Sequence, residues 1–126
     1  DLDGQRALQL REAGQDQAAQ ELMQAALASL REIATDERVL GRERARAYRL
    51  AGYLQVSLGN LGAAERFFEQ ALGFTPRDAE LRLAHLKARR ARCGELEGAE
   101  REECLERWLE ELTVLAAELG GGTRRS

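Results

Sequence analysis

The stretch that decides the fold runs from Tyr48 to Pro76 and reads YRLAGYLQVSLGNLGAAERFFEQALGFTP. It contains two helical patterns separated by Gly59 and Asn60. Glycine readily adopts the left-handed conformation that ends a helix, and asparagine is a favoured N-cap of the next one. We therefore predict a tight turn, with Asn60 capping the second helix. The small residues Gly52 and Ala64 are predicted to face each other across this hairpin, where the helices can approach closely.

Aromatic residues are predicted to fill the wider parts of the hairpin. Tyr48 and Phe68 are expected to share its interior. Beyond the hairpin, Thr75 is predicted to cap a further helix, with Pro76 at the first helical position and Asp78 in a capping box. Because one hairpin cannot bury its apolar face alone, neighbouring helices must stack on it.

The composition of the chain favours helices throughout. The 126 residues are dominated by Ala, Leu, Arg, Glu and Gln, which are good helix formers, and they include one proline. The β-branched residues that pack well in sheets are scarce. We therefore predict an all-α fold, and the length fits a single domain.

The turn at Gly59 has two counterparts in the sequence. Gly14, Gly59 and Gly94 are each followed five residues later by an alanine. Internal similarity of this kind indicates stacked helical hairpins. The predicted organisation is one domain over residues 1–119, with repeats at 1–34, 35–76 and 77–119, and a flexible glycine-rich tail over 120–126.

Seven positions of the central stretch resemble the signature of the tetratricopeptide repeat family: Tyr48, Gly52, Gly59, Ala64, Phe68, Ala71 and Pro76. Ala51 and Gln55 depart from it, because the family usually has leucine and an aromatic residue there. The flanking repeats match less well. The resemblance implies antiparallel helical hairpins stacked as a right-handed superhelix, in which the first helix of each hairpin lines a concave, peptide-binding groove.

About six helices are predicted, and the last would be a long C-terminal cap on the stack. They span about 3–13, 16–33, 36–58, 60–73, 76–92 and 97–119. Thr35, followed by Asp36 and Glu37, is predicted to begin the third helix. Gly41 is predicted to kink or break that helix, at a cost of about 1 kcal/mol relative to alanine.

Charge and hydropathy argue against two classes of function. The net charge of -3 gives no reason to expect nucleic acid, because duplex binding normally requires a basic surface. The longest uncharged stretch, residues 50–64, contains Gln55, Ser57 and Asn60 and is too polar to cross a bilayer. Two cysteines and the lack of a basic-apolar leader predict a cytoplasmic location. The start at Asp1, in place of methionine, predicts a domain excised from a longer chain.

Groups that could carry catalysis or bind metal are few. His85 is the only histidine, and no nucleophile stands in a recognisable motif with it. Cys93 and Cys104 do not have the spacing of metal ligands. A hairpin turn at Cys93 would leave Cys104 about 10 Å away, beyond the reach of a disulfide, so both are predicted to be packing thiols. We predict no catalytic residue, no metal and no cofactor, and therefore no enzyme.

The last two predicted helices carry opposite charges. Residues 77–92 are mainly basic, whereas residues 95–118 are mainly acidic and include a run of glutamates. An acidic run could serve acid–base chemistry or cation binding. Charge complementarity between consecutive helices, with each exposed pair contributing about 0.2–1 kcal/mol, is the simpler explanation.

The resemblance to the repeat family implies which residues face the groove. In the second repeat these are Arg46, Arg49, Leu50, Tyr53, Val56 and Ser57, and in the third they are Leu81, Ala84, His85, Ala88 and Arg92. Leu8 and Arg11 would be a weaker contribution from the first repeat. An apolar floor rimmed with arginine suits a peptide with hydrophobic anchors and acidic flanks. We therefore predict a non-enzymatic adaptor or scaffold that binds a partner protein, although Leu50, Val56 and Ala84 could instead pack between helices.

One well-defined ligand of the family is not expected. Its chaperone-binding members hold a C-terminal carboxylate with a clamp of lysine, asparagine and arginine. The corresponding positions in this chain are occupied by Gly4, Leu8, Leu50, Leu81 and His85. None of them matches, so a different or internal peptide is the expected ligand.

Two other functions are consistent with the sequence. The length of the last helix favours a self-association module, in which a leucine and tryptophan stripe including Trp108 and Leu112 joins two copies. The glycine-rich end and the missing start favour a regulatory appendage of a larger enzyme.

Overall fold

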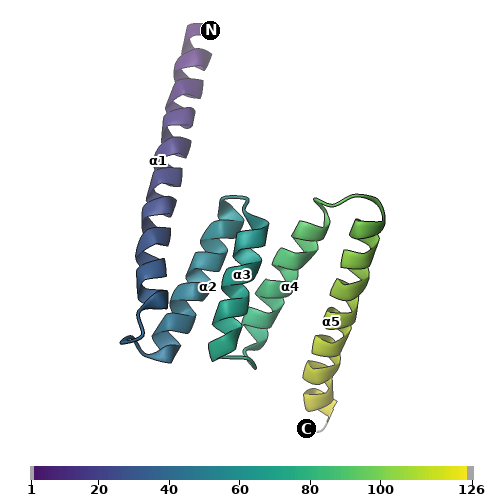
Figure 1. The fold of residues 1–126 in the computed structure, drawn as a ribbon. Helices are drawn as coiled ribbons and strands as arrows, with labels where there is room; N and C mark the ends of the chain where they lie inside the picture. Colours follow the sequence, from purple (N-terminus) through teal and green to yellow (C-terminus); the bar gives the residue numbers. More distant parts are fainter. Residues whose placement is uncertain (1, 125–126) are drawn as a thin grey trace.

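The chain folds into a row of antiparallel helices. The computed structural model describes the backbone of residues 2–124 and the side chains of residues 12–120. This part of the chain contains no strand and five helices: α1 (Leu2–Thr35), α2 (Gly41–Ser57), α3 (Leu61–Phe74), α4 (Ala79–Cys93) and α5 (Gly98–Arg124). Each helix packs against the next one along the chain (Figure 1). The all-α class and the long C-terminal helix are thereby confirmed.

The first helix is the main departure from the expected arrangement. The sequence predicted two helices separated by a turn at Gly14, but α1 is continuous from Leu2 to Thr35. A Cβ added at Gly14 would meet nothing within 4 Å, so no packing contact favours a turn there. One glycine among good helix formers costs only about 1 kcal/mol, which does not end a helix. The predicted hairpin within residues 1–34 is therefore wrong, and the N-terminal half of α1 projects beyond the other helices (Figure 1).

The connection between α1 and α2 also differs from the prediction. Thr35 ends α1 in place of beginning a helix, and its Oγ1 donates to the carbonyl of Arg31 at 2.7 Å. Asp36 then accepts a hydrogen bond from the backbone N–H of Arg38 at 3.0 Å, which is a local turn contact. Gly41 is the first residue of α2, so it neither kinks nor breaks a helix.

The turn between α2 and α3 forms where it was predicted, with a different role for its asparagine. Gly59 has a φ of 82°, the left-handed conformation expected of it. Asn60 is at the N-cap position of α3, but its side chain forms no capping bond. Its Nδ2 donates instead to Oε1 of Gln55 at 3.0 Å, and its backbone N–H donates to the carbonyl of Gln55. Gln55 therefore closes the turn from within α2.

The core is built where α2, α3 and α4 meet. A Cβ added at Gly52 would lie 2.5 Å from Cε1 of Phe68, so the close approach of α2 and α3 is between Gly52 and the Phe68 ring. Ala64, the predicted partner of Gly52, is also fully buried. The core cluster consists of Ala64, Phe68, Ala71, Leu81, Ala84 and Ala88, with Tyr48 and Leu72 packed against it. The predicted common interior for Tyr48 and Phe68 is thus confirmed.

Helix α4 begins three residues later than the sequence predicted. Asp78, at its N-cap, accepts a hydrogen bond from the backbone N–H of Leu81 at 3.1 Å, so Asp78 takes the role assigned to Thr75. Helix α5 extends to Arg124, beyond residue 119, where the sequence predicted its end. Residues 125–126 of the predicted tail lie outside the described residues.

Candidate functional site

One face of α2 carries a stripe of arginine followed by apolar residues. The stripe consists of Arg42, Arg46, Arg49, Tyr53 and Val56, which recur at alternating intervals of four and three residues. This spacing places side chains on one face of a helix. Together with the facing part of α4, the stripe lines two surface depressions, which we call the α2–α4 groove.

The end of the groove near the start of α2 is charged. This depression has a volume of about 210 Å³, and its arginines are Arg42, Arg46 and Arg49. Glu43 and Asp78 also line it. Among the residues that the structure describes, none of the three guanidinium groups forms an ion pair, so their donors remain available to an acidic ligand.

The other end of the groove is apolar. This depression has a volume of about 380 Å³, and its lining includes Tyr53, Val56, Leu61, Phe68, Leu83 and Ala91. Tyr53 is 46% exposed and its ring meets the Phe68 ring edge-on, with 5.2 Å between the centroids. Val56 and Leu83 are also exposed. The depression therefore offers a rigid aromatic wall and partly exposed aliphatic side chains to an apolar anchor.

The structure places the predicted α2 residues largely as expected. Arg46, Arg49, Tyr53 and Val56 line the groove, whereas Leu50 and Ser57 are exposed but line neither depression. Leu8 and Arg11 lie outside the residues whose side chains are described.

The α4 side of the groove matches the prediction only in part. Leu81 lines the charged end, but it is only 1% exposed and belongs to the core. His85 and Arg92 line neither depression of the groove. Ala84 and Ala88 line the apolar end, as predicted, and Glu80, Leu83, Lys87 and Ala91 of α4 line it with them. Each of the four residues that the prediction missed lies one position before a predicted one, on the same side of the helix.

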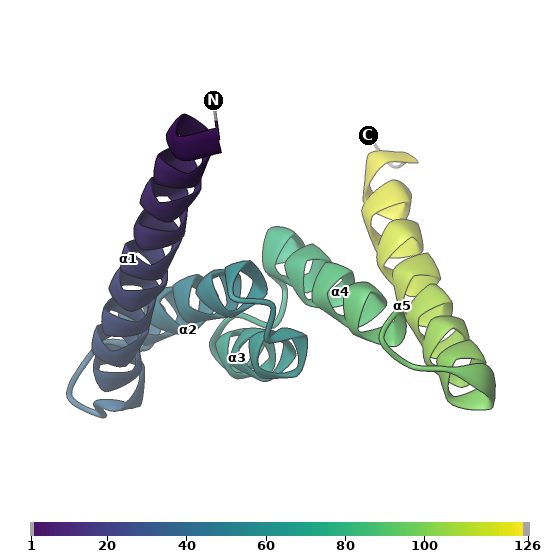
Figure 2. The same cartoon turned by 90° about the horizontal axis from the view of Figure 1, so that it is seen from above.

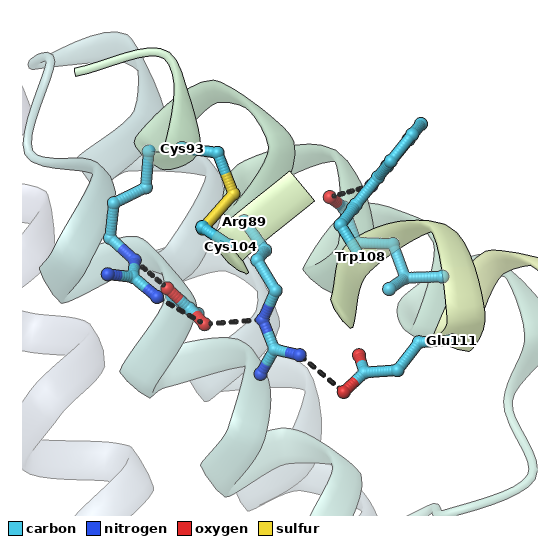
Figure 3. Close-up of a disulfide and its surroundings, with 8 residues drawn as sticks. Arg89, Cys93, Cys104, Trp108 and Glu111 are labelled. Carbon is cyan, nitrogen blue, oxygen red and sulfur yellow. Dashed lines mark hydrogen bonds and ion pairs between the residues drawn. A yellow bond between two sulfur atoms is a disulfide. The ribbon is translucent and has the colours of Figure 1, made fainter. Parts of the chain in front are cut away.

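A buried carboxylate explains why α4 is turned in this way. Glu65 on α3 has a side chain only 8% exposed, and its Oε1 accepts from Nε of Arg89 at 2.9 Å. Its Oε2 accepts from Nε of Arg92. Arg89 also pairs with Glu111 of α5 (Figure 3). These bonds direct the Arg89 and Arg92 edge of α4 toward α3 and away from the groove.

The arginines also control the ionisation of this carboxylate. Burial by itself would raise the pKa of Glu65, but hydrogen bonds from Arg92 and Arg89 outweigh burial and hold the pKa below its usual value. Burial would likewise lower the pKa of Arg89, whereas its bonds to Glu65 and Glu111 raise it. Glu65 therefore stays ionised in the folded protein.

Glu65→Gln is expected to destabilise the protein most at neutral pH. Since the folded pKa of Glu65 lies below the ordinary 4.5, its stabilisation is full above that pH and is lost as pH falls through the folded pKa. The difference in free energy of unfolding between Glu65→Gln and the natural chain should shrink between pH 6 and pH 3. Urea unfolding over a pH series measures it, and a difference independent of pH would contradict the assignment.

Three side chains in this region could in principle hold a metal ion. The ligand atoms of Glu65, Glu69 and His85 lie within 4.8 Å of one another, and His85 Nε2 is 3.3 Å from Glu69 Oε1. However, both oxygens of Glu65 already accept hydrogen bonds from guanidinium groups. A divalent cation would have to displace those bonds and approach two positive charges. The cluster is therefore better described as an ion-pair network that joins α3 to α4.

A disulfide joins α4 to α5, which overturns the prediction of two packing thiols. Cys93 and Cys104 are bonded, with a Cα–Cα distance of 5.6 Å (Figure 3). The predicted separation of about 10 Å between the cysteines assumed that α5 begins level with the end of α4. Figure 2 shows instead that the chain runs outward after α4, so that α5 begins beyond the end of α4 and passes it on its way back. Disulfides persist in oxidising compartments, so the cysteines no longer support a cytoplasmic location.

The rest of the α4–α5 contact follows the predicted charge complementarity. Arg82 pairs with Glu118 at 2.6 Å, and Arg89 pairs with Glu111. Trp108 donates from Nε1 to the carbonyl of Leu86 at 2.9 Å. Trp108 is thus engaged with α4, and the prediction that Trp108 and Leu112 join two copies of the chain stays a prediction.

Comparisons of the chain with other proteins, and of its described helices with membrane-spanning helices, give no match. Among the described residues, none of the helices combines the length and apolar character needed to cross a membrane. The chain matches no protein-family model, no curated protein and no solved structure.

Proposed function

We propose that this chain is a non-enzymatic protein-interaction module of the tetratricopeptide type that binds an acidic and apolar segment of a protein in the α2–α4 groove. The observation that carries the proposal is the continuous stripe from Arg42 to Val56, which changes from basic to apolar along one helix face. A ligand with carboxylates at one end and apolar side chains at the other would match both ends of the groove.

The chemistry of the groove supports affinity for such a segment. Arginine forms charge-assisted and often bidentate hydrogen bonds with carboxylates, and these are stronger than bonds between neutral groups. Arginine and tyrosine are also enriched among the residues that contribute most to protein interfaces. Tyr53 is held against Phe68, so it loses little conformational freedom when a ligand binds.

A displayed library of random 16-residue peptides tests the proposal. We expect the protein to select peptides in which acidic residues precede apolar ones, and we expect Arg46→Glu with Arg49→Glu to weaken their binding at least tenfold. Reversing two charges converts attraction into repulsion at the charged end of the groove. Fluorescence anisotropy with a labelled selected peptide measures the effect.

A matched control separates the groove from general electrostatics. Arg66→Glu with Arg77→Glu makes the same change in net charge at exposed arginines that line neither depression. Binding should be nearly unchanged in this control. Equal losses in both double variants would argue against the groove, as would selection of peptides without acidic residues.

A further inference from the structure

Helix α5 carries two different stripes. The first faces α4 and consists of Cys104, Trp108, Glu111, Leu115 and Glu118. Each of its polar members contacts α4: Trp108 bonds to Leu86, and the two glutamates pair with arginines. Leu115 is buried. This stripe therefore accounts for the packing of α5 on the rest of the chain.

The second stripe lies one residue further along, about 100° around the helix. It consists of Leu105, Leu109, Leu112 and Ala116, at intervals of four, three and four residues. Leu109 is 56% exposed. Glu102 and Glu106 flank the stripe, and both are exposed. We call these six residues the acid–leucine face of α5.

The acid–leucine face matches the α2–α4 groove in length and in order. From Glu102 to Ala116 the face spans about 21 Å at a rise of about 1.5 Å per residue, and the stripe from Arg42 to Val56 has the same length. Both change from charged to apolar in the N-to-C direction. Parallel alignment would place Glu102 and Glu106 level with Arg42 and Arg46, and Leu112 and Ala116 level with the apolar end of the groove. Leu109 would then lie level with Arg49.

A chain cannot fill its own groove with this face. The disulfide between Cys93 and Cys104 holds α5 against α4, and Figure 1 shows α5 on the side of α4 away from α2. The acid–leucine face of one chain can therefore reach only the groove of another.

We propose that the groove binds the acid–leucine face of α5 from a second copy of this chain. This inference rests on the proposed function, because it names the segment that the groove receives. The two patches differ, so the contact either closes reciprocally between two copies as a symmetric dimer or continues head-to-tail through a chain of copies. A symmetric contact between two α5 helices would pair leucines but leave the groove arginines without carboxylate partners.

Charge exchange between the two surfaces tests the inference. The groove variant is Arg46→Glu with Arg49→Glu, and the face variant is Glu102→Arg with Glu106→Arg. Sedimentation over protein concentrations from about 1 to 500 µM should show self-association of the natural chain. Each variant alone should associate at least tenfold more weakly, because like charges then meet. A mixture of the two should associate about as well as the natural chain, since each altered surface meets its complement.

The outcomes separate this inference from the proposed function. A natural chain that stays monomeric, or a mixture that does not recover association, overturns the second-copy proposal. Unchanged association of the groove variant together with loss in the face variant would instead indicate symmetric α5 contact, and also overturns it. If the selected peptides still bind the natural chain and the face variant but not the groove variant, the proposed function stands although this inference fails.

Discussion

Phe68→Ala is expected to lower the free energy of unfolding by about 3–5 kcal/mol, because it removes a fully buried aromatic ring from the meeting point of α2, α3 and α4. Urea unfolding followed by circular dichroism measures the loss. Phe74→Ala is the matched control, since Phe74 is 37% exposed and its truncation should cost much less. Equal effects of the two substitutions would contradict the assignment of Phe68 to the core.

The contact between Gly52 and Phe68 adds a more specific expectation. Gly52→Ala should destabilise the natural chain, because its Cβ would lie 2.5 Å from the ring of the buried Phe68, which would have to shift. In the Phe68→Ala background the same methyl group enters the space that the ring leaves, so it should be tolerated. A double-mutant cycle measures this coupling, and additive effects would show that the two positions do not touch.

Replacement of both disulfide cysteines by alanine is expected to lower stability by about 3 kcal/mol, the value typical of a loop of this length. The loss should be concentrated in α5, because the contacts of α5 with the rest of the chain are made on α4. Hydrogen exchange of α5 amides should therefore accelerate far more than exchange in α2 and α3.

The reduced natural chain is the second arm of this experiment. Treatment with a dithiol should reproduce the exchange pattern of the alanine variant, since both remove the same covalent link. Uniform acceleration across all helices, or no change in α5, would contradict the role of the disulfide as the main tie between α4 and α5.

The sequence was most informative where several local preferences agree. Between Tyr48 and Pro76, a left-handed glycine, a glycine that accepts a ring and a periodic apolar face all specify one hairpin, and that hairpin forms. Gly14 resembles the turn residue Gly59 only in being a glycine. It has no facing ring and no partner comparable to Gln55 and Asn60, so helix propensity prevails and α1 continues through it.

The α2 side of the groove could be predicted from the sequence, whereas the α4 side could be predicted only in part. On α2 the spacing of Arg46, Arg49, Tyr53 and Val56 identified the exposed stripe directly. On α4 the orientation depends on the pairing of Glu65 with Arg89 and Arg92, which brings together residues more than twenty positions apart. Periodicity within one helix does not reveal such a pairing. The one signal in the sequence was that Glu65 lies three residues before the buried Phe68, where a carboxylate needs ion-pair partners.

The disulfide shows the limit of distances counted along a helix. The rise per residue gives the length of α5 but not where α5 starts relative to α4. That offset depends on the path of the connection from Gly94 to Glu97, which brings Cys104 beside Cys93.

The most direct test of the α2–α4 groove is to map a selected peptide on the protein by nuclear magnetic resonance. Titration of the isotopically labelled chain should shift amide signals along Arg42 to Val56 and along Glu80 to Ala91, the two walls of the groove. The signals of Leu72, Val114 and Leu115, which line a separate depression, should stay in place. Shifts confined to that second group, with the groove signals unmoved, would contradict the account.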